Sequence, residues 1–70
     1  MKIVLNGNDE IILQSMPLRE LIEVKGWDPD KIVAELNLEI ISKNSWSNIV
    51  LAENDRLEIL SFMGGGTKNE

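Results

Sequence analysis

One stretch of this seventy-residue chain has the apolar spacing of an amphipathic helix, and this limits the folds open to it. Leu18, Leu21 and Ile22 recur at positions i, i+3 and i+4, and the charged residues between them point elsewhere. A single helix can cover only one face of one sheet. The chain is therefore expected to be a two-layer protein with one helix.

The ends of this helix carry local signals. Ser15 is expected to cap its first turn, and Pro17 fits that turn because its missing N–H would be unpaired there anyway. Gly26 is expected to end the helix after about three turns, since glycine enters the left-handed conformation at low cost.

The other regular segments have strand character, being rich in Ile, Val and Leu or alternating in polarity. They are Met1 to Asn6, Asp9 to Gln14, Ile32 to Asn37, Ile40 with Ile41, and Arg56 to Phe62. The order strand, strand, helix, strand, short strand, strand predicts an α+β fold, the ubiquitin-like β-grasp: a mixed sheet of four to five strands packed on one main helix. In that fold the last strand lies beside the first.

The connections between these segments contain turn-forming residues. Turns are expected at Asn6-Gly7-Asn8, Asp28-Pro29-Asp30 and Asn54-Asp55, and the loop 42–48 could hold one short helical turn with Trp46 packed down as a lid. Ile49, Val50 and Leu51 are expected to reach the core, and Trp27 to be partly buried. Asp28 and Asp30 lack the spaced oxygen ligands of a calcium loop, so no metal site is predicted.

Composition excludes several classes of function. Twelve acidic and seven basic residues give a net charge of −5, and the basic residues are scattered, which disfavours nucleic-acid binding. No apolar stretch approaches the roughly 20 residues of a membrane span, so no membrane role is expected and a cytoplasmic protein is predicted. The chain lacks Cys and His, and it is expected not to be an enzyme by itself.

Gly64-Gly65-Gly66 is the feature that neither a core nor a surface explains. The glycines follow the last strand, and too few residues come after them to build the helix that a phosphate-binding loop requires. One interpretation is a frayed terminus. The other is an arm without side chains that enters a partner's active site; from Phe62 to Gly66 it spans roughly 13–14 Å. The expected organisation is a globular domain over 1–63 and a flexible glycine arm and tail over 64–70.

The chain resembles the ThiS-type sulfur carriers of thiamine biosynthesis. The resemblance covers residues 1 to 66 and rests on Leu5-Asn6-Gly7, Leu18 to Ile22, Val33 to Asn37 with Ile40-Ile41, Trp46, and Asn54 through to Gly66. One departure is Leu38, which stands where the family often has glycine.

The resemblance implies a carrier cycle with no bound cofactor. A ThiF-type adenylyltransferase uses ATP and magnesium to adenylate the carboxylate of Gly66, a sulfur donor system converts it to a thiocarboxylate, and a ThiG-type thiazole synthase takes the sulfur. Gly64, Gly65, Phe62 and Met63 are the implied partner-binding residues, with Phe62 and Met63 as an apolar docking pair.

Thr67 to Glu70 depart from the family, whose members usually finish at the glycine pair. Either a protease trims the chain after Gly66, or the tail is a cloning scar, or the protein has left the carrier role. Two alternatives stay open: a carrier like the small subunit of molybdopterin synthase, and a TGS-like β-grasp interaction module in which the glycines are incidental.

Overall fold

A computed structural model describes residues 1–62 of the chain. Its elements, in chain order, are β1 (Lys2–Leu5), β2 (Asn8–Ile11), α1 (Leu18–Val24), the 3₁₀ turn η1 (Pro29–Lys31), β3 (Ile32–Leu36), β4 (Glu39–Ile41), the 3₁₀ turn η2 (Lys43–Asn48) and β5 (Arg56–Ser61). The strands form one mixed sheet in the order β2-β1-β5-β3-β4. The β1–β5 pair is parallel and the other pairs are antiparallel, so the predicted fold class and the placement of the last strand beside the first are confirmed.

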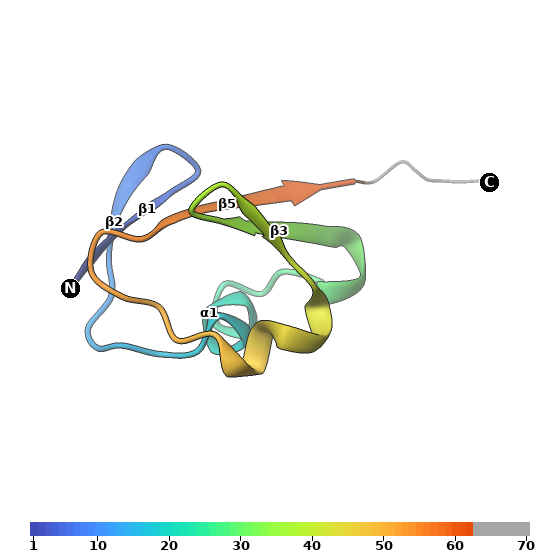
Figure 1. The fold of residues 1–70 in the computed structure, drawn as a ribbon, viewed down its shortest axis with the longest axis horizontal. Helices are drawn as coiled ribbons and strands as arrows, with labels where there is room; N and C mark the ends of the chain where they lie inside the picture. Colours follow the sequence, from blue (N-terminus) through green and yellow to red (C-terminus); the bar gives the residue numbers. More distant parts are fainter. Residues whose placement is uncertain (63–70) are drawn as a thin grey trace.

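The sheet forms one layer, and α1 with η2 forms the other (Figure 1). Alternate residues of the strands point into the space between the layers and pack on the apolar stripe of the helix. The buried side chains are Ile3, Leu5, Ile12, Leu18, Leu21, Ile22, Ile32, Ala34, Leu36, Trp46, Leu51 and Leu57. The opposite face of the sheet, called the outer face below, is not covered by any helix formed within residues 1–62. It includes Val4, Val33, Glu35, Ile40, Arg56, Glu58 and Leu60.

Trp46 closes the end of the core as predicted. Its side chain is 1% exposed, and its indole N–H donates to the carbonyl of Ile41 at 3.1 Å. The hydrogen bond satisfies the one polar atom of the ring, which makes the burial of this large side chain favourable. Trp27 is half-buried against the same core.

The start of the helix differs from the prediction. Pro17, in an extended conformation, occupies the N-cap position, and the hydroxyl of Ser15 instead donates to the carbonyl of Leu51 at 2.7 Å. The helix has seven residues, which is about two turns. Pro17 forms a β-bridge with Val50, and this pairing fixes the chain in an extended form up to the first helical residue.

The end of the helix agrees with the prediction. Gly26 adopts φ +76°, and its N–H donates to the carbonyl of Glu23. The N–H of Trp27 donates to the carbonyl of Ile22, which completes a pattern that terminates helices at a left-handed glycine.

Two smaller predictions were wrong. The second arm of the first hairpin pairs with the first arm through Ile12, whose N–H donates to the carbonyl of Met1 at 2.9 Å, whereas Leu13 is 96% exposed. Of the segment expected to reach the core, Leu51 is buried and Ile49 packs against the core as predicted, but the side chain of Val50, which forms the bridge with Pro17, is exposed.

Both hairpins close with two-residue turns whose central residues have positive φ. The first uses Asn6 (50°) and Gly7 (84°), and the second uses Asn37 (52°) and Leu38 (73°). Positive φ at both positions is the type I′ turn, which suits the twist of a hairpin and favours Asn followed by Gly. Leu38 therefore stands at a position where a side chain is strained.

Candidate functional site

The candidate site is the end of β5, because this strand directly precedes the segment that holds Gly64, Gly65 and Gly66 in the sequence. β5 lies between β3 and β1, with register partners from Ile32↔Ser61 to Leu36↔Leu57 on one side and Val4↔Arg56 with Leu5↔Leu57 on the other. The N–H of Phe62 continues the β3 ladder by donating to the carbonyl of Lys31 at 3.1 Å. β5 thus gives residue 62 a fixed position and direction.

Two asparagines hold β5 from opposite sides. Oδ1 of Asn6 accepts from the N–H of Ile59 at 2.7 Å, and Oδ1 of Asn37 accepts from the N–H of Arg56 at 2.9 Å. The side-chain amide of Asn37 also donates to Asp55, whose other carboxylate oxygen accepts from the N–H of Ala52. Each asparagine occupies a positive-φ turn position and satisfies a strand N–H that no neighbouring strand reaches.

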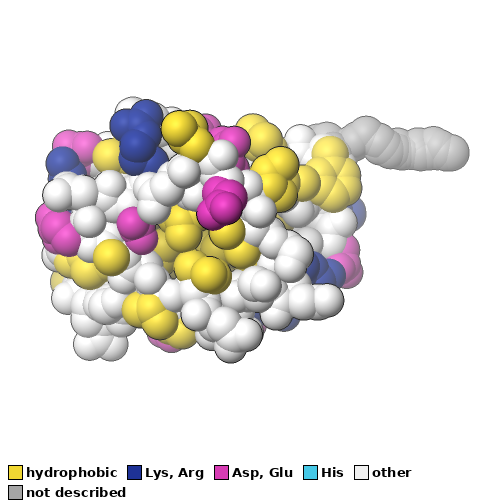
Figure 2. Space-filling view, viewed as in Figure 1, with side chains coloured by type: hydrophobic (Ala, Val, Ile, Leu, Met, Phe, Trp, Pro, Cys, Tyr) yellow, Lys and Arg dark blue, Asp and Glu magenta, His cyan; other side chains and the backbone are white. Residues whose placement is uncertain are grey.

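Apolar side chains gather at the end of β5. Leu60 is 53% exposed and Phe62 is 56% exposed, and Val33 lies beside Leu60 in the register. Figure 2 shows hydrophobic side chains grouped where β5 ends. Contiguous apolar side chains on a surface mark interaction sites. The predicted docking role of Phe62 fits this position, whereas Met63 lies outside the described residues, as do Gly64, Gly65 and Gly66.

Two carboxylates lie side by side on the outer face. Glu35 and Glu58 are register partners, both half-buried, and neither belongs to the four ion pairs formed within residues 1–62. Like charges directly opposite each other on a sheet are destabilising. Together with Leu60 they make the outer face next to the exit of β5 both apolar and acidic.

Over residues 1–62, the side chains offer little chemistry of their own. No group of three or more potential metal-binding carboxylates comes together there. A helix long and apolar enough to cross a membrane is also absent from this part of the chain. One carboxyl is perturbed: the hydrogen bond and the charge of Lys43 lower the pKa of Asp30 below its ordinary value, with a smaller contribution from Arg19, against a small opposing effect of desolvation.

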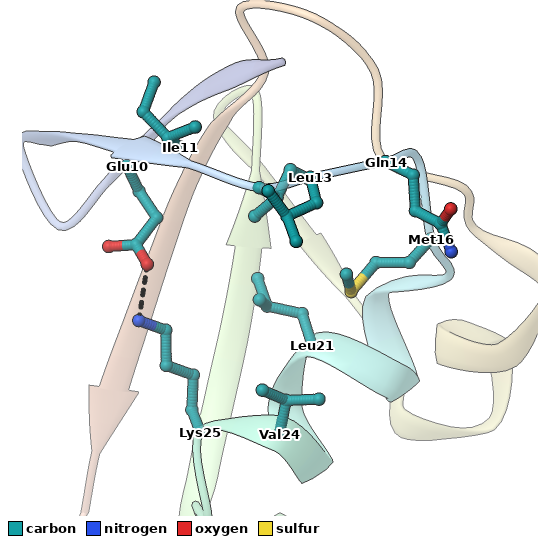
Figure 3. Close-up of a pocket in the computed structure, with 9 residues that line it drawn as sticks. Glu10, Ile11, Leu13, Gln14, Met16, Leu21, Val24 and Lys25 are labelled. Atoms are coloured by element: carbon teal, nitrogen blue, oxygen red, sulfur yellow. Dashed lines mark hydrogen bonds and ion pairs between the residues drawn. The ribbon is translucent and has the colours of Figure 1, made fainter.

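A second surface feature is a hollow of about 630 Å³ between β2 and α1. Figure 3 shows Leu13, Met16, Leu21 and Val24 around it. The ion pair between Glu10 and Lys25 lies at one end of the hollow, with Oε2 of Glu10 and Nζ of Lys25 2.6 Å apart. The two charged residues of the lining are already paired with each other. The hollow thus offers an apolar surface without a converging set of polar groups, and it lies on β2, the edge strand farthest from β4.

Fold and site together define a β-grasp protein whose last strand ends in an apolar exit. The model of the ThiS family matches residues 3–66, so the chain belongs to the ThiS family. The match includes Gly64, Gly65 and Gly66, which the sequence analysis singled out. The recognition of the chain as ThiS-type is therefore confirmed.

The chain is similar to several known proteins. It is 39% identical over 67 residues to a thiazole synthase of Paramagnetospirillum magneticum, covering 96% of this chain and 21% of that protein. It is 35% identical over 66 residues to a thiazole synthase of Magnetococcus marinus, covering 94% of this chain and 20% of that protein. The chain thus spans about a fifth of the length of these curated relatives.

A crystal structure of the thiamine biosynthesis protein ThiS from Geobacter metallireducens has the same fold. The TM-score is 0.82 at 28% identity, and the superposition covers 94% of this chain and all of that one. Family and structural neighbour thus agree with each other and with the fold described above.

Proposed function

We propose that the chain carries sulfur for thiazole formation in thiamine synthesis and that its reactive group is the carboxylate of Gly66. The protein is then a co-substrate that partner enzymes modify. The observation that carries the proposal is the family match through residue 66, combined with a β5 strand that positions Phe62 at the exit of the sheet.

The chemistry follows from the weakness of a carboxylate as an acyl donor. A carboxylate oxygen of Gly66 attacks the α-phosphorus of ATP, and pyrophosphate leaves with the help of magnesium in a ThiF-type partner. Hydrosulfide supplied by a donor system then attacks the acyl carbon, the bond from that carbon to the AMP oxygen breaks, and AMP leaves with loss of the hydrosulfide proton to give a thiocarboxylate. The catalytic groups for these steps have to come from the partners, because this chain has neither Cys nor His.

The second partner is a thiazole synthase. Its support is that two curated thiazole synthases contain a stretch similar to this chain within a protein about five times as long. Covalent linkage gives two domains a high effective concentration, which is useful when one delivers a group to the other. In this chain the same delivery depends on the arm, which reaches roughly 13–14 Å beyond Phe62 when extended.

Thr67 to Glu70 must be removed before this chemistry, since an internal glycine has no free carboxylate. We propose trimming after Gly66. Intact-mass measurement on protein from its native cell tests this directly. The expected product ends at Gly66, with a fraction heavier by the exchange of one oxygen for sulfur. Native protein that always retains Glu70 would instead favour the TGS-like interaction module.

An ATP–pyrophosphate exchange assay with the ThiF-type partner tests the reactive group. A chain ending at Gly66 is expected to support exchange, whereas the chain ending at Glu70 is not. Gly66→Ala is the matched variant: it is expected to keep the same thermal midpoint but to lose exchange, because a Cβ atom obstructs a narrow channel. Exchange at the rate of the unmodified chain in this variant would contradict the proposal.

A further inference from the structure

The hydrogen-bonding groups of β5 alternate between its two neighbours. The carbonyl of Arg56 accepts from Asn37 and the N–H of Phe62 donates to Lys31, so even-numbered residues face β3. The odd-numbered residues face the β1 side, as the bond from the N–H of Asn6 to the carbonyl of Leu57 shows.

β1 accompanies β5 for only part of its length. The parallel register ends at Leu5↔Leu57, where the chain turns away at Asn6, and β5 runs on past this point (Figure 1). Beyond this point the N–H of Ile59 donates its hydrogen bond to the side-chain Oδ1 of Asn6. The carbonyl of Ile59 and the N–H of Ser61, which point to the same side, have no protein partner within residues 1–62.

The second half of β5 is thus an open strand edge. Natural proteins usually cover or charge such edges, because unpaired backbone groups pair readily with another strand. Here the edge is short and exposed at Leu60, Ser61 and Phe62.

We propose that this open edge, Ile59 to Phe62, is where the enzyme that activates the C-terminal carboxylate docks, by adding an extended segment to the sheet beside β5. The inference rests on the proposed function and names the contact through which the partner holds this chain. Strand addition supplies affinity through backbone hydrogen bonds, and side-chain contacts on the two faces supply specificity.

The distance to the reactive group favours this occupant. Gly66 is four residues beyond Phe62, so an active site that takes its carboxylate lies within roughly 13–14 Å of the edge. An added strand that pairs with Ser61 also runs alongside the end of β5. The glycine arm would then enter the active-site channel of the partner in an extended form.

The side chains around the edge define the chemistry of the added segment. Leu60 and Phe62 offer apolar contact, and on the same face Glu58, with Glu35 beside it on β3, offers two carboxylates that belong to none of the four ion pairs within residues 1–62. A segment with an apolar residue and an Arg or Lys on this face is complementary. A second copy of this chain is less suitable, since it would bring together two molecules of net charge −5.

Amide hydrogen exchange tests the inference on the unaltered chain. In the free protein the N–H of Ser61 is expected to exchange rapidly, whereas the N–H of Leu60, which faces β3, is protected. At saturation with the ThiF-type enzyme, exchange at Ser61 should slow by about tenfold or more. An unchanged rate at Ser61 in the saturated complex overturns the inference. Protection that appears in the free chain with rising concentration also overturns it, since the occupant is then a second copy.

Ser61→Pro tests the same contact by substitution. Proline removes the one N–H in question and is tolerated where that N–H faces solvent. The affinity for the enzyme should fall about tenfold, whereas Ser61→Ala, which keeps the N–H, should bind like the unmodified chain. Urea unfolding of both variants establishes that they are folded, and a folded Ser61→Pro protein with undiminished affinity overturns the inference.

The two proposals fail in different ways. If the chain ending at Gly66 supports ATP–pyrophosphate exchange but Ser61 stays unprotected in the complex, only the docking edge is wrong. If no exchange occurs with the cognate enzyme, the proposed function is wrong, whatever the protection of Ser61.

Discussion

Oδ1 of Asn6 accepts a hydrogen bond from the backbone N–H of Ile59 at 2.7 Å, across 53 positions of sequence. Asn6 also occupies the first positive-φ position of the β1–β2 turn. One residue therefore closes the hairpin and ends the pairing of β1 with β5. Through this bond the local turn chemistry fixes the place where the open edge of β5 begins.

Substitution of Asn6 should separate these two roles. Asn6→Gly keeps the freedom to adopt positive φ and loses only the side-chain bond, so the free energy of unfolding should fall by about 1 kcal/mol. Asn6→Ala loses both the side-chain bond and the freedom to adopt positive φ, so its free energy of unfolding should fall by about 2 kcal/mol. Urea unfolding measures both values. Equal losses for the two variants would show that the turn conformation contributes nothing.

The exposed ring of Phe62 should matter for partner binding and little for folding. Phe62→Ser is expected to weaken binding to the adenylating enzyme by about tenfold, because an apolar side chain at a docking surface is lost. Leu13→Ser is the matched control: Leu13 is also exposed, but it lies at the β2 edge of the molecule. Comparable weakening by both changes would indicate a general loss of hydrophobicity and not a docking site at β5.

The pair of Asp30 and Lys43 should be visible in a pH titration. Lys43 lowers the pKa of Asp30 in the folded protein. A carboxyl with a lowered folded pKa contributes stability that is fully present above its unfolded pKa, about 3.9, and is lost as the pH falls through the folded pKa. Lys43→Gln should bring the pKa of Asp30 back toward its ordinary value, as followed by carboxyl ¹³C NMR.

Salt provides the control for this titration. Asp30 is exposed, so added salt should weaken the effect of Lys43 in the unmodified protein. In Lys43→Gln the same salt should change the pKa of Asp30 much less. A titration of Asp30 that is identical in the two proteins would mean that the ion pair does not persist in solution.

Much of the fold could be predicted because its signals are local. The Asn6-Gly7 turn and the Gly26 helix end follow from the conformational freedom of single residues, and both are present. The helix stripe of Leu18, Leu21 and Ile22 required one covered sheet face, and all of these side chains are buried. Such signals need only a few neighbouring residues, which a single sequence provides.

The remaining features depend on residues far apart in the chain. The bonds from Asn6 to Ile59 and from Asn37 to Arg56 are set by the order of strands in space, and nothing in the local pattern distinguishes these asparagines from ordinary turn residues. The same applies to Ser15, whose expected capping role gave way to a bond with Leu51. At the site, the glycines could be singled out by composition, whereas the open edge of β5 became visible only with the β1–β5 register.

Leu38 offers a direct test of strain in the second hairpin. It adopts φ +73° and its side chain is 87% exposed, so the residue bears a conformational cost without much burial in return. Leu38→Gly should therefore raise the free energy of unfolding by about 0.5–1 kcal/mol, even though glycine loses more backbone entropy on folding. Leu38→Ala is the control, since it removes most of the side chain but keeps the Cβ atom and hence the strain. Urea unfolding should show the Leu38→Gly protein to be more stable than the Leu38→Ala protein by about 1 kcal/mol. A glycine variant no more stable than the alanine variant would show that the turn relieves the strain in another way.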